Sequence, residues 1–420
     1  MKWRSICLAD ASQEFISGGT PSTKNPDLWT GPIPWITGAD VVDGRAVTGR
    51  RFISESAVRE SAANVVPRGG VLLVTRTGVG KIAIAHEDIA ISQDLTGIVV
   101  KDAFVPAFVM WAIRSQIGSL VAVQRGATIK GVLRSDVERM PIPFTGKSEQ
   151  RRIVELLEQA DGLRRKRAEA DALADRILPA LFHKMFGDPA TNPKGWNKNR
   201  LGDVILEAAY GTSNPSNTNG EGLPVLRMNN ISSGGQLDLT ELKHVVLEKA
   251  EATKHLLADG DLLFNRTNSK ELVGKTGLWR GQLPAVAASY LIRVRLDTTV
   301  VVPDYVWAWM NTTYFKQRLF DIARRAVGMA NINAAELRAM PVLVPALRLQ
   351  ENFAERVKDL VGLAKQRLEA TRQLEGLFIV MLHRAFTGEL TAKWREAHLK
   401  ELLAEMEQQA RLLRLANQNN

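Results

Sequence analysis

Two long segments of the chain carry apolar residues at alternating steps of three and four positions. In the first segment, the apolar positions are Ile153, Leu156, Ala160, Leu163, Ala170, Ala174, Ile177 and Leu181. In the second segment, they are Phe353, Leu360, Leu363, Ala370, Leu374, Leu377 and Met381. This spacing is typical of a helix that buries one narrow stripe against a partner helix. We therefore predict two long helices that pair with each other as an antiparallel coiled coil.

The two predicted helices share one irregularity and differ in another. Arg167 and Arg367 each fill the position where the apolar stripe has a gap. Pro179 lies inside the first segment, where the second segment has Ile379. A proline ring clashes with the carbonyl group four residues earlier and removes one helical hydrogen bond. We therefore expect the first helix to kink or break about one turn before Pro179.

The segments that precede the two helices show a mixed pattern of strands and helices. Residues 69–85 read as strand, turn and strand, with glycines at the turn, and residues 260–279 repeat this unit with four extra residues. Residues 103–121 and 302–325 are amphipathic with helical spacing. Each long helix is therefore expected to follow a globular part that contains both strands and helices.

These similarities belong to an internal duplication of the whole chain. Residues 140–186 align without a gap with residues 340–386, at a constant offset of 200. Further upstream, residues 72–77 resemble residues 262–267, and the offset drifts as loop insertions would make it drift. A period near 200 is too long for a solenoid. The chain is therefore expected to contain two copies of a module, related by a local two-fold axis.

The expected fold class is α+β, with two mixed α/β domains separated by two long antiparallel coiled-coil helices in a pseudo-two-fold repeat. The C-terminal segment has no counterpart in the first copy and reads as one more helix, docked on the body or on another subunit. The expected boundaries are 1–144 for the first mixed domain, 145–188 for the central helical spacer, 189–345 for the second mixed domain, 346–386 for the distal helical spacer and 387–420 for the helical tail.

Composition and charge narrow the class of protein. The chain has 420 residues, of which 45% are hydrophobic and 24% charged, and this balance is ordinary for a folded protein. The formal net charge of +10 favours an anionic partner, nucleic acid before membrane. A single cysteine, Cys7, excludes an intramolecular disulfide and a zinc site built from several thiolates. Without a long apolar run or an apolar leader, we expect a cytoplasmic protein that has no contact with membrane.

Two segments imitate a phosphate-binding loop but lack its defining residues. Residues 75–82 lack the first glycine and the final hydroxyl, and residues 269–276 lack the first glycine. Both segments lead into a further strand, where a phosphate loop would open a helix. The histidines show no metal-binding spacing, and we find no catalytic constellation. We therefore expect no enzyme; the alternatives are a DNA-independent helical scaffold, or a nucleotide-dependent enzyme if one of the two loops is real.

Small polar and basic residues recur in the loops of both globular parts. Arg and Asn can grip base edges with two hydrogen bonds, whereas Thr, Ser and Lys suit phosphate groups. Solvated turns are the alternative interpretation, but the Arg-Thr pair recurs at the same place in both copies, which favours binding. The candidate DNA-binding residues are Thr20, Ser22, Lys24, Arg76, Thr77, Lys81, Arg125, Lys130, Arg227, Asn229, Arg266, Thr267, Asn268 and Lys270.

Several motifs, given in the same order in both halves, resemble a known family. They are G-G-T-P-S (18–22), I-P-W-I-T-G-A-D-V (33–41), L-L-V-T-R-T-G-V-G-K (72–81), M-P-I-P followed by Q-R-R-I (140–153), A-L-F-H-K-M-F (180–186) and M-L-H-R-A-F-T-G-E-L (381–390). Together they resemble the specificity (S) subunit of a type I restriction-modification system, over nearly the whole chain. The first motif has only a loose second copy, Gly211-Thr212-Ser213.

The resemblance implies a function for each part. Each mixed domain is then a target recognition domain that reads one half of a bipartite sequence in double-stranded DNA. The long helices are a spacer and a dock for two methyltransferase subunits, with restriction and translocase subunits as further partners. The resemblance also implies that this chain binds no cofactor, and that S-adenosylmethionine, ATP and magnesium belong to the partner subunits.

Overall fold

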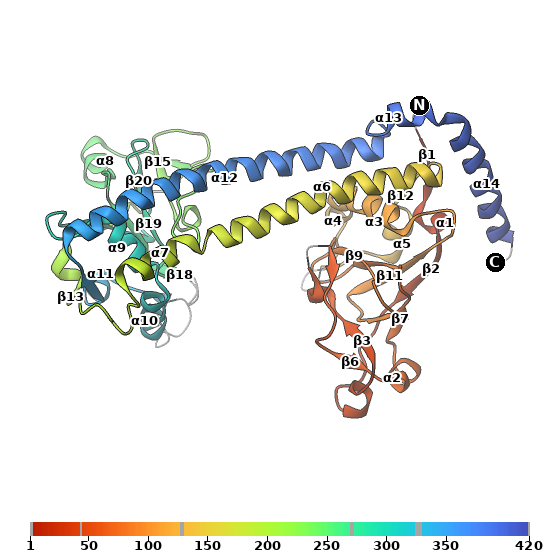
Figure 1. Ribbon diagram of the computed structural model, residues 1–420, viewed down its shortest axis with the longest axis horizontal. Coiled ribbons are helices and arrows are strands. Elements are labelled where there is room, and N and C mark those ends of the chain that lie inside the picture. Colours follow the sequence, from red (N-terminus) through yellow and green to blue (C-terminus); the bar gives the residue numbers. More distant parts are fainter. Residues whose placement is uncertain (1–2, 43, 127–129, 269–272, 324–329, 419–420) are drawn as a thin grey trace. The chain divides into compact units, whose positions relative to one another are not determined.

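The structure, a computed structural model, describes all residues except 1–2, 43, 127–129, 269–272, 324–329 and 419–420 (Figure 1). The chain forms two compact units, described one at a time below. Unit 1 consists of residues 1–166 and 371–420, and unit 2 consists of residues 167–370. Each unit therefore contains one globular part together with a portion of both long helices. This content of helix and sheet confirms the predicted α+β class.

The globular part of unit 1 contains two four-stranded sheets, in the orders β2-β11-β8-β9 and β6-β3-β10-β7. Its elements are β1 (Arg4–Cys7), α1 (Leu8–Ala11), β2 (Ser12–Ser17), η1 (Pro26–Trp29), β3 (Ile33–Ile36), η2 (Gly38–Asp40), β4 (Val41–Val42), β5 (Arg45–Ala46), β6 (Phe52–Ile53), α2 (Glu55–Glu60), β7 (Asn64–Val66), β8 (Val71–Val74), β9 (Ile82–Ile84), β10 (Ile89–Ile91), β11 (Leu95–Val100), α3 (Pro106–Ser115), α4 (Ile117–Ala122), α5 (Arg134–Glu138) and β12 (Pro141–Phe144). All four residues of β8 are buried, as befits a strand that is covered on both faces.

The globular part of unit 2 repeats this plan with a sheet in the order β14-β21-β17-β19 and a second sheet in the order β16-β15-β20. Its elements are β13 (Asn197–Arg200), η3 (Leu201–Val204), β14 (Ile205–Tyr210), β15 (Leu223–Leu226), η4 (Met228–Asn230), β16 (Lys243–Val245), α8 (Lys249–His255), β17 (Leu262–Asn265), β18 (Thr267–Asn268), β19 (Thr276–Leu278), β20 (Val286–Ala287), β21 (Leu291–Leu296), α9 (Pro303–Met310), α10 (Thr313–Ala323), β22 (Ala330–Asn331), α11 (Ala334–Arg338) and β23 (Pro341–Val344). The two hairpins read from sequence are β8–β9 and β17–β19, both antiparallel.

Two buried glutamines show how closely the copies match. The Gln150 carbonyl oxygen accepts a hydrogen bond from the amide of Val105 at 2.8 Å, and its amide group donates to the carbonyl of Thr145 at 2.9 Å. Gln350 repeats both bonds, with the amide of Val302 at 2.9 Å and the carbonyl of Pro345 at 2.8 Å. Each glutamine thus ties the start of a long helix to the start of an earlier helix of the same unit, α3 or α9.

The long helices are α6 (Lys147–Ala174), α7 (Ile177–Phe186) and α12 (Leu347–Thr387). The first segment breaks at residues 175–176, one turn before Pro179, as its ring predicts. The second segment, with Ile379 at the matching position, is one unbroken helix of 41 residues. In unit 2, Asp171 contacts Arg367 and Phe182 contacts Phe353, so residue numbers rise along one helix as they fall along the other. The antiparallel pairing is therefore confirmed.

The apolar stripe, however, does not run through the middle of the helix pair. Four residues expected in the stripe are largely exposed, namely Leu163 (59%), Ile177 (48%), Leu363 (55%) and Leu377 (67%). The expectation was wrong at these positions because charged groups hold the helices together there.

In unit 1, the charged contact is a paired one: Arg164 donates to both oxygens of Glu375, at 3.0 and 2.6 Å. In unit 2, Arg367 donates to Asp171 at 2.9 Å and to Asp175 at 2.8 Å, and Arg167 donates to the carbonyl of Arg367 at 2.9 Å. The arginines that fill the gap in each stripe are thus the residues that join the helices of unit 2.

The C-terminal tail forms two helices, α13 (Ala392–Ala397) and α14 (Leu399–Gln418), where the sequence predicted one. Both lie against the start of α6 in unit 1. Arg395 and Thr391 contact the fully buried carboxylate of Glu149 at 2.7 and 2.6 Å. The Glu405 carboxylate accepts a hydrogen bond from the amide of Ser148 at 2.9 Å and so caps α6. Along the described part of the chain, no helix has the length and hydropathy needed to cross a membrane.

Candidate nucleic-acid interface

A short polar turn between β10 and β11 organises the candidate loops of unit 1. The Thr20 hydroxyl donates to the Gln93 side chain at 2.6 Å, and the Arg76 amide donates to the carbonyl of Asp94 at 3.2 Å. The same turn is therefore flanked by two candidate segments that are separate in the sequence, namely the loop after β2 and the tip of the β8–β9 hairpin. Gln93 and Asp94 were not among the candidates, although a short polar run between two apolar segments was a usable signal in the sequence.

Two further candidate residues join the hairpin tip. Gly131 forms isolated bridges with both Arg76 and Arg125, and the amide of Thr77 donates to the carbonyl of Lys130 at 3.3 Å. The side chains of Arg76, Thr77, Arg125 and Lys130 are all exposed. Three positive groups and one hydroxyl thus gather on two adjoining loops, an arrangement that suits the phosphates of a nucleic acid.

Unit 2 uses the same frame. The amide of Arg266 donates to the carbonyl of Tyr290 at 3.0 Å, which matches the bond between Arg76 and Asp94 in unit 1. Strand β18, which begins at Thr267, pairs with β22, and the Thr267 hydroxyl donates to the side chain of Asn331 at 3.1 Å. Of the remaining candidates here, Lys270 lies outside the described residues, and only the backbone of Asn268 is described.

Equivalent lysines fasten each hairpin to a 3₁₀ helix. Lys81 donates to the carbonyl of Gly38 in η2 at 3.3 Å. Lys275 donates to the carbonyls of Met228 in η4 and of Ile231, at 2.9 and 2.6 Å, and burial lowers the pKa of Lys275 below its usual value. Both lysines thus bond to backbone, and strands β9 and β19 follow them. The resemblance to phosphate-binding loops is therefore superficial.

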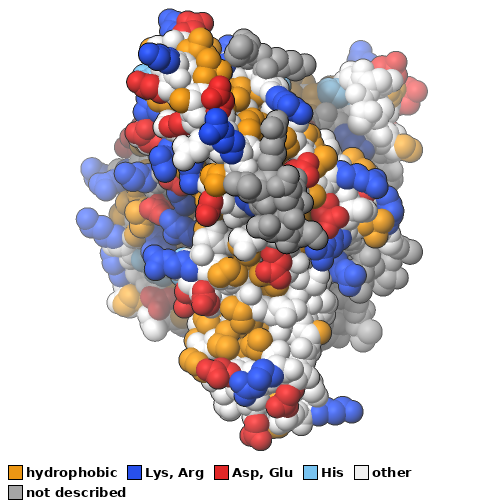
Figure 2. All heavy atoms as spheres, turned by 90° about the vertical axis from the view of Figure 1, so that its right-hand side faces the viewer, with side chains coloured by type: hydrophobic (Ala, Val, Ile, Leu, Met, Phe, Trp, Pro, Cys, Tyr) orange, Lys and Arg blue, Asp and Glu red, His pale blue; other side chains and the backbone are white. Residues whose placement is uncertain are grey.

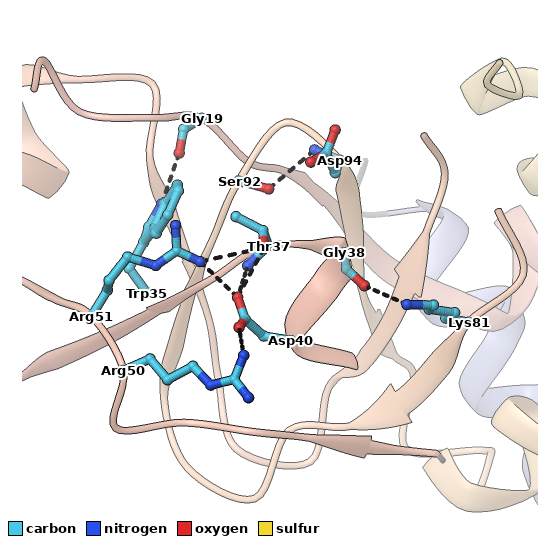
Figure 3. A network of polar contacts seen from close by, with 10 residues as sticks. All are labelled: Gly19, Trp35, Thr37, Gly38, Asp40, Arg50, Arg51, Lys81, Ser92 and Asp94. Carbon is cyan, nitrogen blue, oxygen red and sulfur yellow. Dashed lines mark hydrogen bonds and ion pairs between the residues drawn. The ribbon is translucent and has the colours of Figure 1, made fainter. Parts of the chain in front are cut away.

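Asp40, the last residue of η2 in unit 1, is the centre of a cluster of charged groups, drawn in Figure 3. Buried Asp40 accepts hydrogen bonds from the amide of Thr37 at 2.8 Å, from Arg51 at 2.8 Å and from Arg50 at 3.2 Å. Burial raises the pKa of Asp40, but the bonds from Thr37 and the charge of Arg51 outweigh it and hold the pKa below its usual value. Arg51 also lies over the ring of Trp35, at 4.6 Å from its centroid.

Arg50 and Arg51 were not among the candidates, although two adjacent arginines beside a glycine were visible in the sequence. In unit 2, Asn230 takes the place of Asp40 and accepts a hydrogen bond from the amide of Arg227 at 3.0 Å. Arg227, which immediately precedes η4, is half-buried, whereas Asn229 within η4 is exposed. The two units therefore share a backbone arrangement while they present different side chains.

The loop after β2 is held close to the second sheet. A Cβ atom at Gly18 would collide with the carbonyl oxygen of Ile91, and one at Gly211 would collide with that of Ala287, so both positions need glycine. Ser22 accepts a hydrogen bond from the amide of Lys24 at 3.3 Å, and both side chains are exposed. Gly211 is therefore the structural counterpart of Gly18, although the residues that follow it differ.

Charge is mixed on the one face of the molecule that Figure 2 draws. On the face drawn in Figure 2, Lys and Arg side chains are interspersed with Asp and Glu, without a continuous basic patch. Within the described ranges, no group of three or more His, Cys, Asp or Glu side chains is arranged to hold a metal ion. On this face, the mixed charges do not form the uniform basic coating that a purely electrostatic attraction to nucleic acid would use.

Known proteins resemble this chain in sequence and in fold. Residues 2–170 match the family model of the type I restriction modification DNA specificity domain. The MjaIX specificity subunit of Methanocaldococcus jannaschii is 31% identical over 48% of this chain, which spans about half (51%) of that relative. The EcoKI specificity subunit of Escherichia coli K12 is 26% identical over 86% of this chain and 83% of its own length.

Solved structures show the same fold at lower identity. The S subunit of a type I restriction-modification system from M. genitalium has a TM-score of 0.55 and 15% identity, over 92% of this chain and 96% of that one. A structure from a study of the assembly of the type I system has a TM-score of 0.54 and 20% identity, over 93% and 98%. With two matched units and long antiparallel helices, the chain is similar in sequence and in fold to type I restriction-modification specificity subunits, and its residues 2–170 match their DNA specificity domain.

Proposed function

We propose that the chain is the DNA-recognition subunit of a type I restriction-modification complex and that it reads a bipartite target, one unit per half-site. The observation that carries this proposal is the repeated frame around two different sets of side chains. The bond from Arg76 to Asp94 recurs as the bond from Arg266 to Tyr290, while the residues at the acceptor position differ. A shared backbone arrangement that presents two different sets of side chains suits two half-sites of different sequence.

The two recognition domains of this proposal are residues 1–144 and 189–345, and the fourteen candidate residues are its DNA contacts. Support comes from the grouping of Arg76, Thr77, Arg125 and Lys130 on adjoining exposed loops. Contacts to phosphate position such a domain, and contacts to base edges give it specificity. The exposed Arg50 is a further candidate for contact with the backbone of DNA.

Catalysis then belongs to partner subunits, because members of this family recognise DNA and do not modify it. The proposed partners are two methyltransferase subunits, which bring S-adenosylmethionine, and restriction subunits, which bring ATP and magnesium. The helices offer apolar surface for docking, since Leu173, Leu377 and Ile379 are each more than 60% exposed. Large exposed apolar side chains on a paired helix are typical of an interface with another protein.

A nucleotide-dependent enzyme finds no support in the structure, because both lysines of the imitated loops bond to backbone carbonyls. A helical scaffold without a DNA function remains distinguishable by experiment. It would show no salt-dependent binding of duplex DNA, whereas contacts to phosphate and bases make binding both sequence-specific and weaker as salt rises.

The decisive experiment exchanges one domain. Residues 1–144 are replaced by the matching domain of a relative, the subunit is expressed with its partners, and methylated sites are mapped across the host genome. We expect one half of the methylated motif to change and the other half to stay. The reciprocal exchange of residues 189–345 is the matched control and should change the other half. If both halves or neither half change, one domain does not serve one half-site.

A further inference from the structure

The two equivalent arginines have the same backbone setting. Each follows a central strand, β8 or β17, and each donates its amide to the residue that precedes the next strand of the sheet. These bonds run from Arg76 to Asp94 at 3.2 Å and from Arg266 to Tyr290 at 3.0 Å. Any difference in what the two side chains do therefore comes from their neighbours.

Arg266 has an aromatic support that Arg76 lacks. Its guanidinium group lies over the ring of Tyr210, 4.8 Å from the ring centroid. Tyr210 immediately precedes Gly211, and the residue that precedes the matching Gly18 is Ser17. Because serine has no ring, the corresponding place in unit 1 offers no surface for stacking.

The Tyr210 side chain that supports Arg266 is itself held by the sheet and by a hydrogen bond. Tyr210 is paired with Ile292 in the sheet, and its hydroxyl accepts a hydrogen bond from the amide of Ala334, at the start of α11, at 3.2 Å. The carbonyl of Arg266 accepts a hydrogen bond from the amide of Ile332 at 2.9 Å. Both the ring and the backbone of the arginine are thus held before any ligand arrives, which lowers the entropic cost of binding.

The polar groups of the Arg266 guanidinium have no partner among the described residues. Its Nε atom is buried without a hydrogen-bond partner. Among the described residues, no acidic side chain forms an ion pair with Arg266, and no hydrogen bond from its two terminal nitrogens is present. A planar fork that is stacked on one face and has no polar partner at its edge matches the O6 and N7 acceptors of guanine.

Arg76 has the opposite surroundings. Its side chain is exposed, and its loop adjoins the loop that carries Arg125 and Lys130. Arg125 lies 3.7 Å from Asp136, so part of this charge is neutralised. An unsupported arginine among other basic side chains acts as a mobile positive charge, for which a phosphate group is the fitting partner.

We propose that Arg266 reads a guanine in the half-site bound by unit 2, with Tyr210 as its positioning residue, whereas Arg76 contacts the phosphate backbone. This assignment rests on the proposed function and adds a division of labour between two residues that the duplication makes equivalent. It follows that lysine, a point charge without a planar fork, can replace Arg76 but not Arg266.

The test selects bound sequences from a pool of duplex oligonucleotides with a randomised segment, using the full chain and four variants. With Arg266→Lys, we expect preference for guanine at one position to fall roughly 5- to 150-fold. With Arg76→Lys, the motif should persist and the affinity should stay within about threefold of wild type. Tyr210→Phe keeps the ring and should keep the preference, whereas Tyr210→Leu should relax the same position as Arg266→Lys.

The outcomes separate the two proposals. If the wild-type chain selects no motif, the proposed function fails and this assignment fails with it. If the wild-type chain selects a bipartite motif that Arg266→Lys leaves intact, or if Arg76→Lys relaxes a position, only the assignment is overturned. Thermal unfolding of each variant identifies loss of folding, and Tyr210→Phe against Tyr210→Leu distinguishes the stacking ring from the hydroxyl.

Discussion

Glu149 is a fully buried carboxylate whose partners lie far away in the chain. It accepts hydrogen bonds from Arg395 at 2.7 Å, from Thr391 at 2.6 Å and from Thr145. The matching residue of the second copy is Leu349. The fold therefore accepts an apolar residue at this position. The carboxylate of Glu149 occurs in the copy where the C-terminal tail supplies Arg395 to neutralise it.

The first prediction concerns the ion pair of Arg395 with Glu149. Replacing Arg395 by Met leaves a buried, uncompensated carboxylate, and we expect the free energy of unfolding to fall by about 3–5 kcal/mol. The double variant Arg395→Met with Glu149→Leu removes both charges and should recover most of this loss. Urea unfolding measures all three proteins and the Glu149→Leu single variant. A double variant no more stable than Arg395→Met would show that the charge is not the cause.

The second prediction uses the pH dependence of stability. The ammonium group of Lys316 donates to the carbonyl of Gly274, and burial, with repulsion from Lys275, lowers the pKa of Lys316 to about 7. The unfolded chain has a lysine pKa of about 10.4. Between these two values the unfolded state binds more protons than the native state, so stability rises with pH across this window, by about 1.4 kcal/mol per unit at most.

The matched variant is Lys316→Met, which has no titrating group at this position. We expect wild type to gain stability relative to Lys316→Met between about pH 7 and about pH 9. Urea midpoints at both pH values give the comparison. A difference between the two proteins that does not change with pH would contradict a lowered pKa for Lys316.

At the scale of the elements, the helix pair is joined differently in each unit. Unit 1 contributes the pair of Arg164 with Glu375, and unit 2 contributes the pair of Arg367 with Asp171. The border between the units falls after Lys166 in α6 and after Ala370 in α12. Both positions lie between the charged pairs, so an insertion there leaves every contact within a unit intact.

The third prediction tests the helices as a ruler between half-sites. Inserting four residues after Lys166 and four after Ala370 adds about one helical turn, roughly 5.4–6 Å. We expect both half-sites to be unchanged and the preferred DNA spacer to lengthen by about one to two base pairs, at roughly 3.4 Å each. Mapping of methylated sites across the host genome measures both the half-site sequences and the length of the spacer. A folded insertion variant that keeps the original spacer would leave the helices as a dock for partners only.

For the whole molecule, the tail adds a further difference between the two copies. Gly146 and Ser148 lie against Leu402 and Glu405 of the tail. The matching residues of the second copy are Ala346 and Arg348. A Cβ atom at position 146 would meet the Leu402 side chain, so the start of α12 does not offer the surface that holds the tail in unit 1.

The fourth prediction is that the tail stabilises unit 1 alone. Removing residues 388–420 strips Glu149 of Arg395 and Thr391, and strips the Ala103 carbonyl of its 2.6 Å bond from Gln409. We expect hydrogen exchange at the start of α6 to accelerate at least about 100-fold. The matching amides at the start of α12 are the internal control and should keep their protection. Equal acceleration at both places would mean that the tail acts on the whole chain.

Much of this architecture was determined by the sequence alone. The stripe of apolar residues predicts the long helices, Pro179 predicts the break between α6 and α7, and the offset of 200 predicts the repeat. These features depend on hydrogen bonds and side chains within one or two turns of each other, so a pattern along the chain is enough to find them. The Arg-Thr pairs at the hairpin tips were visible for the same reason.

Other features were decided only by the tertiary structure. The stacking of Arg266 on Tyr210, the turn at Asp94 beside Arg76, and the tail that reaches Glu149 join residues that lie far apart in the chain. The exposure of Leu163 belongs here as well, because the opposite helix meets that level with charged groups. Such contacts depend on which loops the sheets and helices bring together, and that placement results from the packing of the whole unit, not from any local pattern.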